Sequence, residues 1–415
     1  MKLTVSKLHL ATILPAALGL SSACTEETDS PEIRGQGQGI AIINSDYTST
    51  SISLLDPATG TLARDDCMNS GTKPPAPSLA LSGDVVLPSQ PQEGHELLAI
   101  DRGNSALTWI DPTACTPSRQ LAVGTGFFAN PHEVVSISAT KAYVTRYERN
   151  ESPTDDKTDF DEGSDILIIN PTTPAITGRI DLGSYAVKVE GAEIQARPDR
   201  AIRANGKVYV ALANLSADYK AAGHGRIVVV DTEKDAVEGT IDIPGLKGCG
   251  GLHYLEAQKS LLVSCGGSFS DGEKQADGAG IVTIDLGART PAITKTLRVT
   301  PFGGRVVTGF EVQSMSDELG FTVTFGSFSG PPPDTFWSFN PRAGTAEKLF
   351  DANGGFVLGA FRVDTKRNKV YLADGSKNEP RIHVFEAKPG QAVVKTGAVV
   401  PNPARGLPPR DLAWY

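Results

Sequence analysis

The sequence predicts an all-β protein: a seven-bladed β-propeller whose C-terminal strand closes the first blade. The first observation behind this prediction is a repeat, in which an apolar run ends in an acidic or amide residue and a short turn. The seven residues that end these runs, the anchor residues, are Asp56, Asp111, Asn170, Asp231, Asp285, Asn340 and Glu386. They lie between 46 (340 to 386) and 61 (170 to 231) residues apart, and such a period is typical of propeller blades.

The second observation is a further apolar run upstream of each anchored run, as KVYVALAN precedes RIVVVD. Such continuous runs are typical of strands that are buried on both faces, as the inner strands of a propeller are. The segments KAYVTRY, KVYVALAN and KVYLADGS resemble the YVTN-type propeller repeats of bacterial surface and periplasmic proteins. The resemblance covers nearly all of residues 39–415 and implies the fold, but it implies no particular activity.

The two ends of the propeller are expected to share one blade. The first blade starts at GIAIINS without an innermost strand, and the C-terminal LPPRDLAWY matches the innermost-strand pattern of NPHEVVSIS. We therefore expect the last strand to complete the first blade, which would protect a sheet edge.

The N-terminus has the layout of a secretory signal peptide over residues 1–23. Two lysines precede an apolar run that is too short to span a bilayer as a mature helix, and small residues follow. The sequence LSSAC resembles the lipobox of bacterial lipoproteins, which implies an acylated Cys24 as the first mature residue. Ordinary cleavage after Ala23 is the alternative.

Residues 24–38 are polar and rich in glycine, so we expect a flexible tether between a membrane anchor and the propeller domain of residues 39–415. No apolar segment of helix length follows the signal, and no transmembrane span is expected in the mature chain. The lipoprotein resemblance implies the cell envelope, either the periplasm or the outer membrane. In the Gram-negative lipoproteins that the sequence resembles, an aspartate after the acylated cysteine favours retention in the inner membrane. Thr25 stands at that position here, which favours the outer membrane.

Four cysteines remain when Cys24 is set aside, an even number in a chain bound for an oxidising compartment. Cys249 and Cys265 are expected to face each other across a hairpin within disulfide reach. Cys67 and Cys115 are then the remaining pair. The sequence has no CxxC motif, so we expect both bonds to be structural.

Composition fits a turn-rich β protein, with 43 glycines, 28 prolines and an apolar share of 40%. The formal charge of −9 argues against nucleic acid as a partner, because phosphate-backbone binding needs a basic patch. The acidic anchors are interpreted as turn residues, since an Asp or Asn side chain bonds the backbone ahead of it.

One face of the ring is expected to carry the function. The loops between second and third strands are long, as in RYERNESPTDDKTDFDEGS, whereas the turns after the anchors are short. In propeller topology the long loops share a face with the connections between blades. Binding groups concentrate on such loops, so we place a protein or small-ligand partner there.

The first residues of the innermost strands should converge on the central opening of that face. These funnel candidates are His132, Glu133, Asp199, Arg200, Glu311, Arg362, Arg410 and Asp411. They could hold an anionic ligand or a cation, or form an internal ring of salt bridges around a channel.

Aromatic residues offer two further forms of binding. The candidate walls of a small-ligand pocket are Phe127, Phe128, Tyr147, Tyr185 and Tyr219. The run SFSGPPPDTFW would instead suit a protein-interaction platform.

Metal and catalytic sites are the other hypotheses. Calcium is the one cofactor considered, on a loop with oxygen ligands but without EF-hand spacing; a solvated acidic loop is the alternative. The loop's candidates are Asp155, Asp156, Asp159, Asp161, Glu162 and Asp165. A transition metal would need His132, His224 and His253 with Asp199 or Glu133.

Lactone-hydrolysing propellers have related repeats, and His132 with Glu133 could supply a general base. However, the chain has no nucleophile elbow or triad order, and adjacent strand residues point to opposite faces. A binding role is therefore favoured over catalysis.

Overall fold

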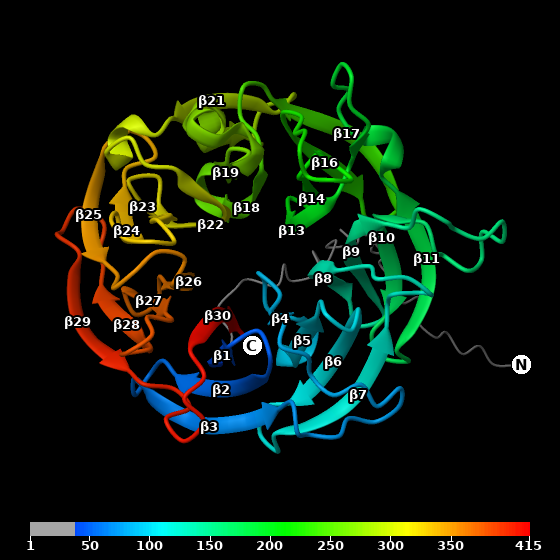
Figure 1. Cartoon of the computed structure of the whole chain (residues 1–415), viewed down its shortest axis with the longest axis horizontal. Coiled ribbons are helices and arrows are strands. Elements are labelled where there is room, and N and C mark those ends of the chain that lie inside the picture. Colours follow the sequence, from blue (N-terminus) through cyan, green and yellow to red (C-terminus); the bar gives the residue numbers. More distant parts are fainter. Residues whose placement is uncertain (1–37) are drawn as a thin grey trace, which may run out of the picture. The chain divides into compact units, whose positions relative to one another are not determined.

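The computed structural model describes residues 38–415, which form a ring of seven four-stranded antiparallel sheets (Figure 1). The predicted all-β fold and seven blades are confirmed. The predicted signal peptide, Cys24 and the tether up to residue 37 lie outside the described residues. Within residues 38–415, no helix combines the length and the apolar character needed to cross a membrane.

Each blade is built from four consecutive strands, except that the first takes its inner strand from the C-terminus. From the centre outward, blade 1 consists of β30 (Pro409–Trp414), β1 (Ile40–Ser45), β2 (Thr50–Asp56) and β3 (Thr61–Asn69). Blade 2 consists of β4 (Val85–Val86), β5 (Leu97–Asp101), β6 (Ala106–Asp111) and β7 (Thr116–Ala122). Blade 3 consists of β8 (Pro131–Ser138), β9 (Lys141–Arg149), β10 (Gly163–Asn170) and β11 (Ala175–Asp181).

The remaining blades follow the same order. Blade 4 consists of β13 (Pro198–Ala204), β14 (Lys207–Leu212), β16 (Gly225–Asp231) and β17 (Ala236–Ile243). Blade 5 consists of β18 (Cys249–Leu255), β19 (Ser260–Gly266), β20 (Ala279–Asp285) and β21 (Ala292–Leu297). Blade 6 consists of β22 (Val307–Ser316), β23 (Leu319–Thr324), β24 (Thr335–Phe339) and β25 (Ala346–Asp351). Blade 7 consists of β26 (Leu358–Asp364), β27 (Lys369–Asp374), β28 (Arg381–Glu386) and β29 (Val394–Val399).

The short elements lie in the connections. A two-stranded sheet pairs β12 (Ile194–Gln195) with β15 (Leu215–Ser216), and the 3₁₀ helices are η1 (Glu93–His95), η2 (Gly183–Tyr185), η3 (Glu256–Gln258), η4 (Phe269–Gly278) and η5 (Thr300–Phe302).

The core lies between neighbouring blades, because the middle strands of each sheet are covered on both sides. Residues 208–212 of β14 are all buried, whereas the outer strand β17 alternates between exposed and half-buried positions along most of its length. One apolar cluster joins Ile227 and Val229 of blade 4 to Leu261 and Val263 of blade 5. The continuous apolar runs of the sequence therefore correspond to strands packed between two sheets.

The ring closes as predicted. β30 pairs antiparallel with β1, with Trp414 opposite Ile40 and Asp411 opposite Ile43. Figure 1 shows the C-terminal strand β30 beside the N-terminal strand β1 at the inner edge of the first blade.

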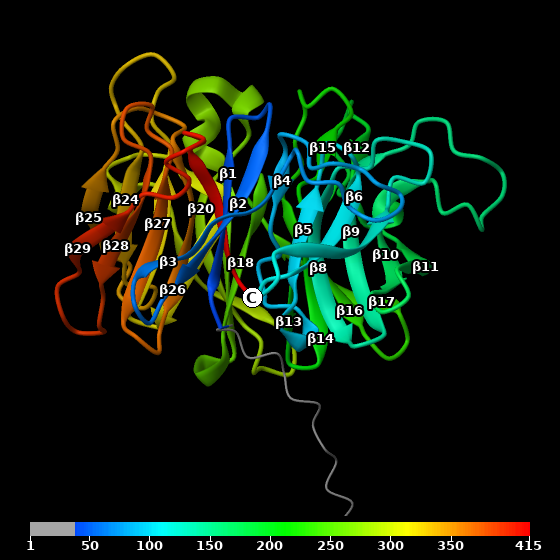
Figure 2. The ribbon, with the colours of Figure 1, turned by 90° about the horizontal axis from the view of Figure 1, so that it is seen from below.

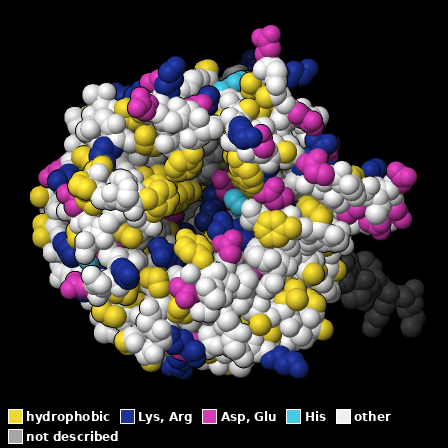
Figure 3. Space-filling model, viewed as in Figure 1, with side chains coloured by type: hydrophobic (Ala, Val, Ile, Leu, Met, Phe, Trp, Pro, Cys, Tyr) yellow, Lys and Arg dark blue, Asp and Glu magenta, His cyan; other side chains and the backbone are white. Residues whose placement is uncertain are grey.

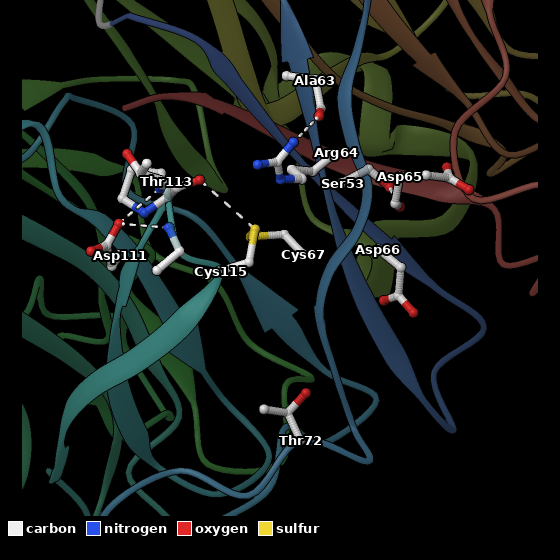
Figure 4. Close-up of a disulfide and its surroundings, with 12 residues drawn as sticks. Ser53, Ala63, Arg64, Asp65, Asp66, Cys67, Thr72, Asp111, Thr113 and Cys115 are labelled. Atoms are coloured by element: carbon white, nitrogen blue, oxygen red, sulfur yellow. Dashed lines mark hydrogen bonds between the residues drawn. A yellow bond between two sulfur atoms is a disulfide. The ribbon is translucent and has the colours of Figure 1, made fainter.

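Both predicted disulfides are present. Cys249 and Cys265 are bonded across the hairpin of β18 and β19. Cys67 of β3 is bonded to Cys115 in the turn after β6, so the second disulfide joins blades 1 and 2 (Figure 4). It closes a sequence separation of 48 residues, for which the chain-entropy treatment gives about 4 kcal/mol of stabilisation.

The anchor residues are turn residues, as interpreted from the sequence. Asp111 Oδ1 accepts hydrogen bonds from the backbone N–H groups of Thr113, at 2.8 Å, and Ala114, at 3.0 Å (Figure 4). The same bond from the backbone two residues ahead is made by the other Asp and Asn anchors, namely Asp56, Asn170, Asp231, Asp285 and Asn340.

The two faces of the ring differ in the way that the sequence predicted (Figure 2). On one face, hereafter the loop face, the long connections are residues 150–162, 213–224, 267–278 and 325–334. On the opposite face, hereafter the turn face, the strands are joined by short turns such as 171–174, 205–206 and 232–235. The length of the connections thus varies on the loop face, whereas the strands and the turns of the turn face are regular.

Blade 2 departs from the regular pattern, because its inner strand β4 has only two residues. The chain continues as residues 87–92, hereafter the cross-channel segment, alongside the inner strands of blades 3 and 4. Ser89 N–H donates to Glu133 Oε1 at 2.9 Å, and Gln90 exchanges hydrogen bonds with the backbone of Arg203. The segment therefore occupies part of the central opening.

Candidate functional site

A cavity of about 380 Å³ opens at the centre of the loop face. Blades 1, 2, 3, 4, 6 and 7 line it with side chains of two kinds. The charged ones are Asp84, Arg102, His132, Asp199, Arg200, Glu311, Arg410 and Asp411, and the aromatic ones are Tyr47, Phe310, Phe325 and Phe356. Figure 3 shows this hollow, with hydrophobic side chains gathered along one side of it and basic and histidine side chains inside.

Six of the eight funnel candidates lie in this cavity, and Glu133 and Arg362 lie behind it. Arg362 is buried and donates a hydrogen bond to Glu311 Oε2 at 2.9 Å. The inner strands therefore converge as expected, because each begins at the loop-face end of its blade. Arg102, Asp84 and the aromatic residues were missed. Except for Phe310, which lies in the inner strand β22, they come from loops whose path the sequence pattern does not define.

The carboxylates of the cavity already have partners. Asp84 is paired with Arg102, and Glu311 with Arg362. Asp411 Oδ2 accepts a hydrogen bond from the Leu87 backbone N–H at 2.8 Å, and Asp411 Oδ1 accepts one from the backbone N–H of Leu412. Each negative charge is thus neutralised or hydrogen-bonded within the fold.

Arg410 differs from the other arginines around the cavity. Its Nε donates to the Ser45 carbonyl at 3.3 Å, and its guanidinium lies 5.3 Å from the centre of the Tyr47 ring. Across residues 38–415, no carboxylate forms an ion pair with Arg410, whereas Arg102, Arg200 and Arg362 all have one. An arginine in a cavity without a counter-ion is suited to an anionic ligand group.

His132 and Asp199 form the second polar feature of the cavity. His132 Nδ1 lies 2.7 Å from Asp199 Oδ1, and the His132 ring stacks on Tyr147 with centroids 4.3 Å apart. Burial would raise the pKa of Asp199, but His132 and Arg200 hold it below its ordinary value. His132 Nε2 is buried and has no hydrogen-bond partner in the described part of the chain.

Glu133 points away from His132, as the alternation of a strand requires. It is fully buried, and its Oε1 accepts hydrogen bonds from the backbone of Ser89 and Val134. Burial raises the pKa of Glu133 to about 7, although Arg200, with its Nη1 3.6 Å from Oε2, opposes the shift. His132 therefore faces the cavity and Glu133 faces the cross-channel segment, so the two side chains do not share one site.

The aromatic wall is fixed by a buried carboxylate. Asp334 accepts four backbone hydrogen bonds, from Gly326 and from Phe356, Val357 and Leu358 of the next blade. Phe356 has a φ of +58°, in the left-handed region that bulky side chains rarely adopt. Strained residues of this kind concentrate at ligand sites, because the surrounding structure must hold them in place.

The predicted metal ligands do not gather in the structure. Asp165 is buried between Arg146 and Arg179, and Asp156 caps its own loop through Thr158. His253 Nε2 lies 2.9 Å from the Ser314 carbonyl, and burial lowers the pKa of this histidine to about 4. Within residues 38–415, no three His, Cys, Asp or Glu side chains are placed to share one metal ion.

The aromatic walls proposed from the sequence lie elsewhere, since none of the five lines the central cavity. Phe127 packs against Arg146, and Tyr219 against Arg197. The run SFSGPPPDTFW does reach the rim of the cavity, through the exposed Phe328 that stacks on Phe356.

A larger cavity, of about 520 Å³, lies on the turn face between blades 2 and 3. Its polar side chains are bonded to one another: Arg119 to Glu96, and Ser136 to Gln92. We therefore take the central cavity, with its free arginine, as the candidate site.

No family model matches the chain, and no curated protein sequence matches it. Solved structures of similar fold include a hypothetical selenium-binding protein from Sulfolobus tokodaii, which is 11% identical with a TM-score of 0.59 over 92% of this chain and 94% of that one. The periplasmic gluconolactonase of Pseudomonas aeruginosa is 12% identical, with a TM-score of 0.57 over 90% and 98%.

The β-propeller domain of Cps50 from Myceliophteria thermophila is also 12% identical, with a TM-score of 0.55 over 86% of this chain and 98% of that one. At such identities the likeness shows the propeller fold and nothing finer.

Proposed function

We propose that this chain is an exported propeller that binds a small molecule in the central cavity of its loop face. The observation that carries the proposal is the combination, in one cavity of about 380 Å³, of an aromatic wall with an arginine that has no carboxylate partner. Ligand sites typically pair an apolar wall with a few polar groups that fix orientation. The internal ring of salt bridges accounts for the other charges, but it leaves Arg410 unexplained.

Export is supported by the two disulfides, which form and persist in oxidising compartments. The signal-like N-terminus and the lipobox-like LSSAC further support a mature chain that begins at an acylated Cys24. We place the protein at the cell envelope, in the periplasm or on the outer membrane, held by its lipid anchor.

Native mass spectrometry of the protein purified from its own host tests both parts. The proposal predicts an acyl-modified mature chain that retains one small molecule per chain. Replacing Ala360, a cavity residue, by phenylalanine should remove the retained molecule, because the larger ring fills the space. Ala343→Phe, at an exposed position on the turn face, is the matched control and should keep the molecule.

Three outcomes of this experiment contradict the proposal. The first is a wild-type chain that is bare, the second a chain that carries only another protein, and the third an adduct that the Ala360→Phe variant keeps. A mature mass without the acyl group would contradict the lipid anchor alone.

Lactone hydrolysis is a second candidate, which the His132–Asp199 pair favours. Asp199 orients the imidazole, and Nε2 could take a proton from water as the water adds to a lactone carbonyl. The imidazolium would then return the proton to the ring oxygen as the C–O bond breaks, which gives a hydroxy acid. A panel of sugar lactones tests it: wild type should hydrolyse one of them, and His132→Gln should lose turnover while keeping affinity.

A further inference from the structure

Five phenylalanines extend the aromatic wall of the cavity outward onto the surface. This phenylalanine track consists of Phe269, Phe310, Phe325, Phe328 and Phe356. Phe325 is the hub, with ring centroids 5.5 Å from Phe310, 4.6 Å from Phe356 and 6.1 Å from Phe269. Phe328 stacks on Phe356 at 3.7 Å. The residues come from blades 5, 6 and 7, so three loop regions meet to form the track.

The outer end of the track lies in solvent. The exposed fractions are 83% for Phe328, 66% for Phe269 and 41% for Phe310. Figure 3 shows hydrophobic side chains on one side of the hollow and on the surface beside it. Contiguous exposed apolar patches are uncommon on monomeric proteins and mark binding surfaces.

The cavity end of the track faces charged groups instead. Phe310, Phe325 and Phe356 line the cavity together with Arg410, whose guanidinium has no ion pair within residues 38–415. A ligand that occupies both regions therefore needs an anionic group for the arginine and an apolar portion for the track. A compact anion would leave Phe328 and Phe269 uncovered, and a neutral hydrocarbon would leave Arg410 without its counter-ion.

We propose that the cavity binds an anionic amphiphile, with its acidic head group on Arg410 and its hydrocarbon chain along the phenylalanine track toward Phe328 and Phe269. This inference rests on the proposed binding function and names the ligand class of the same site. Charge complementarity selects the sign of the head group, and the continuity of the track with the cavity selects the chain.

Isothermal titration calorimetry with three probes tests the proposal on the folded protein, from which any retained molecule has been removed by dialysis against apolar resin. The probes are decanoate, butyrate and the decyltrimethylammonium ion. Decanoate should bind at least about 100-fold more tightly than butyrate, because each further buried methylene strengthens binding by about fourfold. The cation should bind at least about 10-fold more weakly than decanoate, because it has no partner for Arg410.

Two variants distinguish the contribution of the acidic head group to binding from that of the hydrocarbon chain. Phe269→Ser combined with Phe328→Ser changes only exposed rings, and should cut the ratio of decanoate to butyrate affinity by about 10-fold or more. Arg410→Gln should weaken decanoate and butyrate alike, by about 10-fold or more. Phe128→Ser, at a ring that is 55% exposed but outside the track, is the matched control and should change neither affinity.

Each contrary result is distinct. An unchanged ratio in the double serine variant would overturn the track, and an unchanged affinity in Arg410→Gln would overturn the head-group site. Absence of decanoate binding would overturn the whole inference. In each of these cases the proposed function stands if the wild-type chain from its host still carries a small molecule that Ala360→Phe loses, and falls with the inference if it does not.

Discussion

The loop face and the turn face are built from the same strands, yet their polar side chains do different things. On the turn face, each Asp or Asn anchor bonds the backbone of its own turn two residues ahead. On the loop face, buried side chains reach the neighbouring blade: Ser105 accepts the Ala129 N–H, Ser164 the Arg197 N–H, and Asp334 three N–H groups of blade 7.

This difference favours the loop face as the place for a ligand site. Each Asp or Asn anchor bonds its own turn, so these turns stay short and repeat around the ring even where one of them also contacts the next blade, as Asp235 contacts Tyr143. Contacts between blades fix long loops against a rigid scaffold, which allows strained and exposed aromatic residues such as Phe356 and Tyr47 to remain beside an open cavity.

The largest expected effect comes from removing the strand that serves both faces. Truncation after Pro408 deletes β30, which closes blade 1 and carries Arg410 and Asp411 into the cavity. We expect loss of the cooperative unfolding transition, because the β1 edge and both flanking blade interfaces would be exposed. Circular dichroism during urea titration measures this, and a truncated chain with wild-type stability would contradict the closure.

The next prediction compares two polar residues of blade 6, Asp334 on the loop face and the anchor residue Asn340 on the turn face. Asp334→Ala leaves the half-buried N–H groups of Phe356 and Val357 and the buried N–H of Leu358 without an acceptor, and should lower the free energy of unfolding by at least about 3 kcal/mol. Asn340→Ala on the turn face removes local bonds to exposed backbone, and should cost about 1 kcal/mol or less. Equal losses in urea unfolding would contradict the contrast.

A smaller, pH-dependent effect is expected from Glu133. Its folded pKa of about 7 lies above the ordinary glutamate value of 4.5, so the folded state binds the extra proton between these values. Stability should therefore fall as pH rises from about 4.5 to 7, by up to about 3 kcal/mol from this group. Glu133→Gln should flatten that part of the curve, measured as urea midpoints from pH 4.5 to 8. An unchanged slope would show that Glu133 is ionised throughout.

The smallest expected effect is on the turn-face cavity. Arg119→Gln removes the ion pair with the half-exposed Glu96, and should change stability by less than about 1 kcal/mol while leaving ligand binding at wild-type strength. Loss of the retained molecule in this variant would place the binding site on the turn face and contradict the proposed site.

The repeat made the fold predictable, because apolar runs, turn residues and their spacing are local properties of the sequence. The same regularity placed His132, Asp199, Arg200, Glu311, Arg410 and Asp411 at the cavity, since each lies in the first half of an inner strand. The aromatic wall was not predictable in this way. Phe325 and Phe356 stack because a buried Asp334 and a left-handed backbone at Phe356 direct their loops, and neither feature leaves a periodic signal.

Blade 2 shows the same limit. Its inner strand is cut to two residues, and the cross-channel segment is held by Glu133 and Asp411 from other blades. Contacts between residues so far apart in the chain cannot be found from one sequence. The acidic loop suggested calcium, whereas Asp165 is paired with Arg146 and Arg179 of the two neighbouring strands, and the run of acidic residues alone gives no sign of this pairing.

The most direct test of the account is a crystal structure of the protein purified from its host with its bound molecule retained. The account predicts electron density for that molecule in the central cavity, with an acidic group on the Arg410 guanidinium and the remainder against Phe325 and Phe356. Density in the turn-face cavity beside Arg119, with the central cavity filled by water alone, would contradict it.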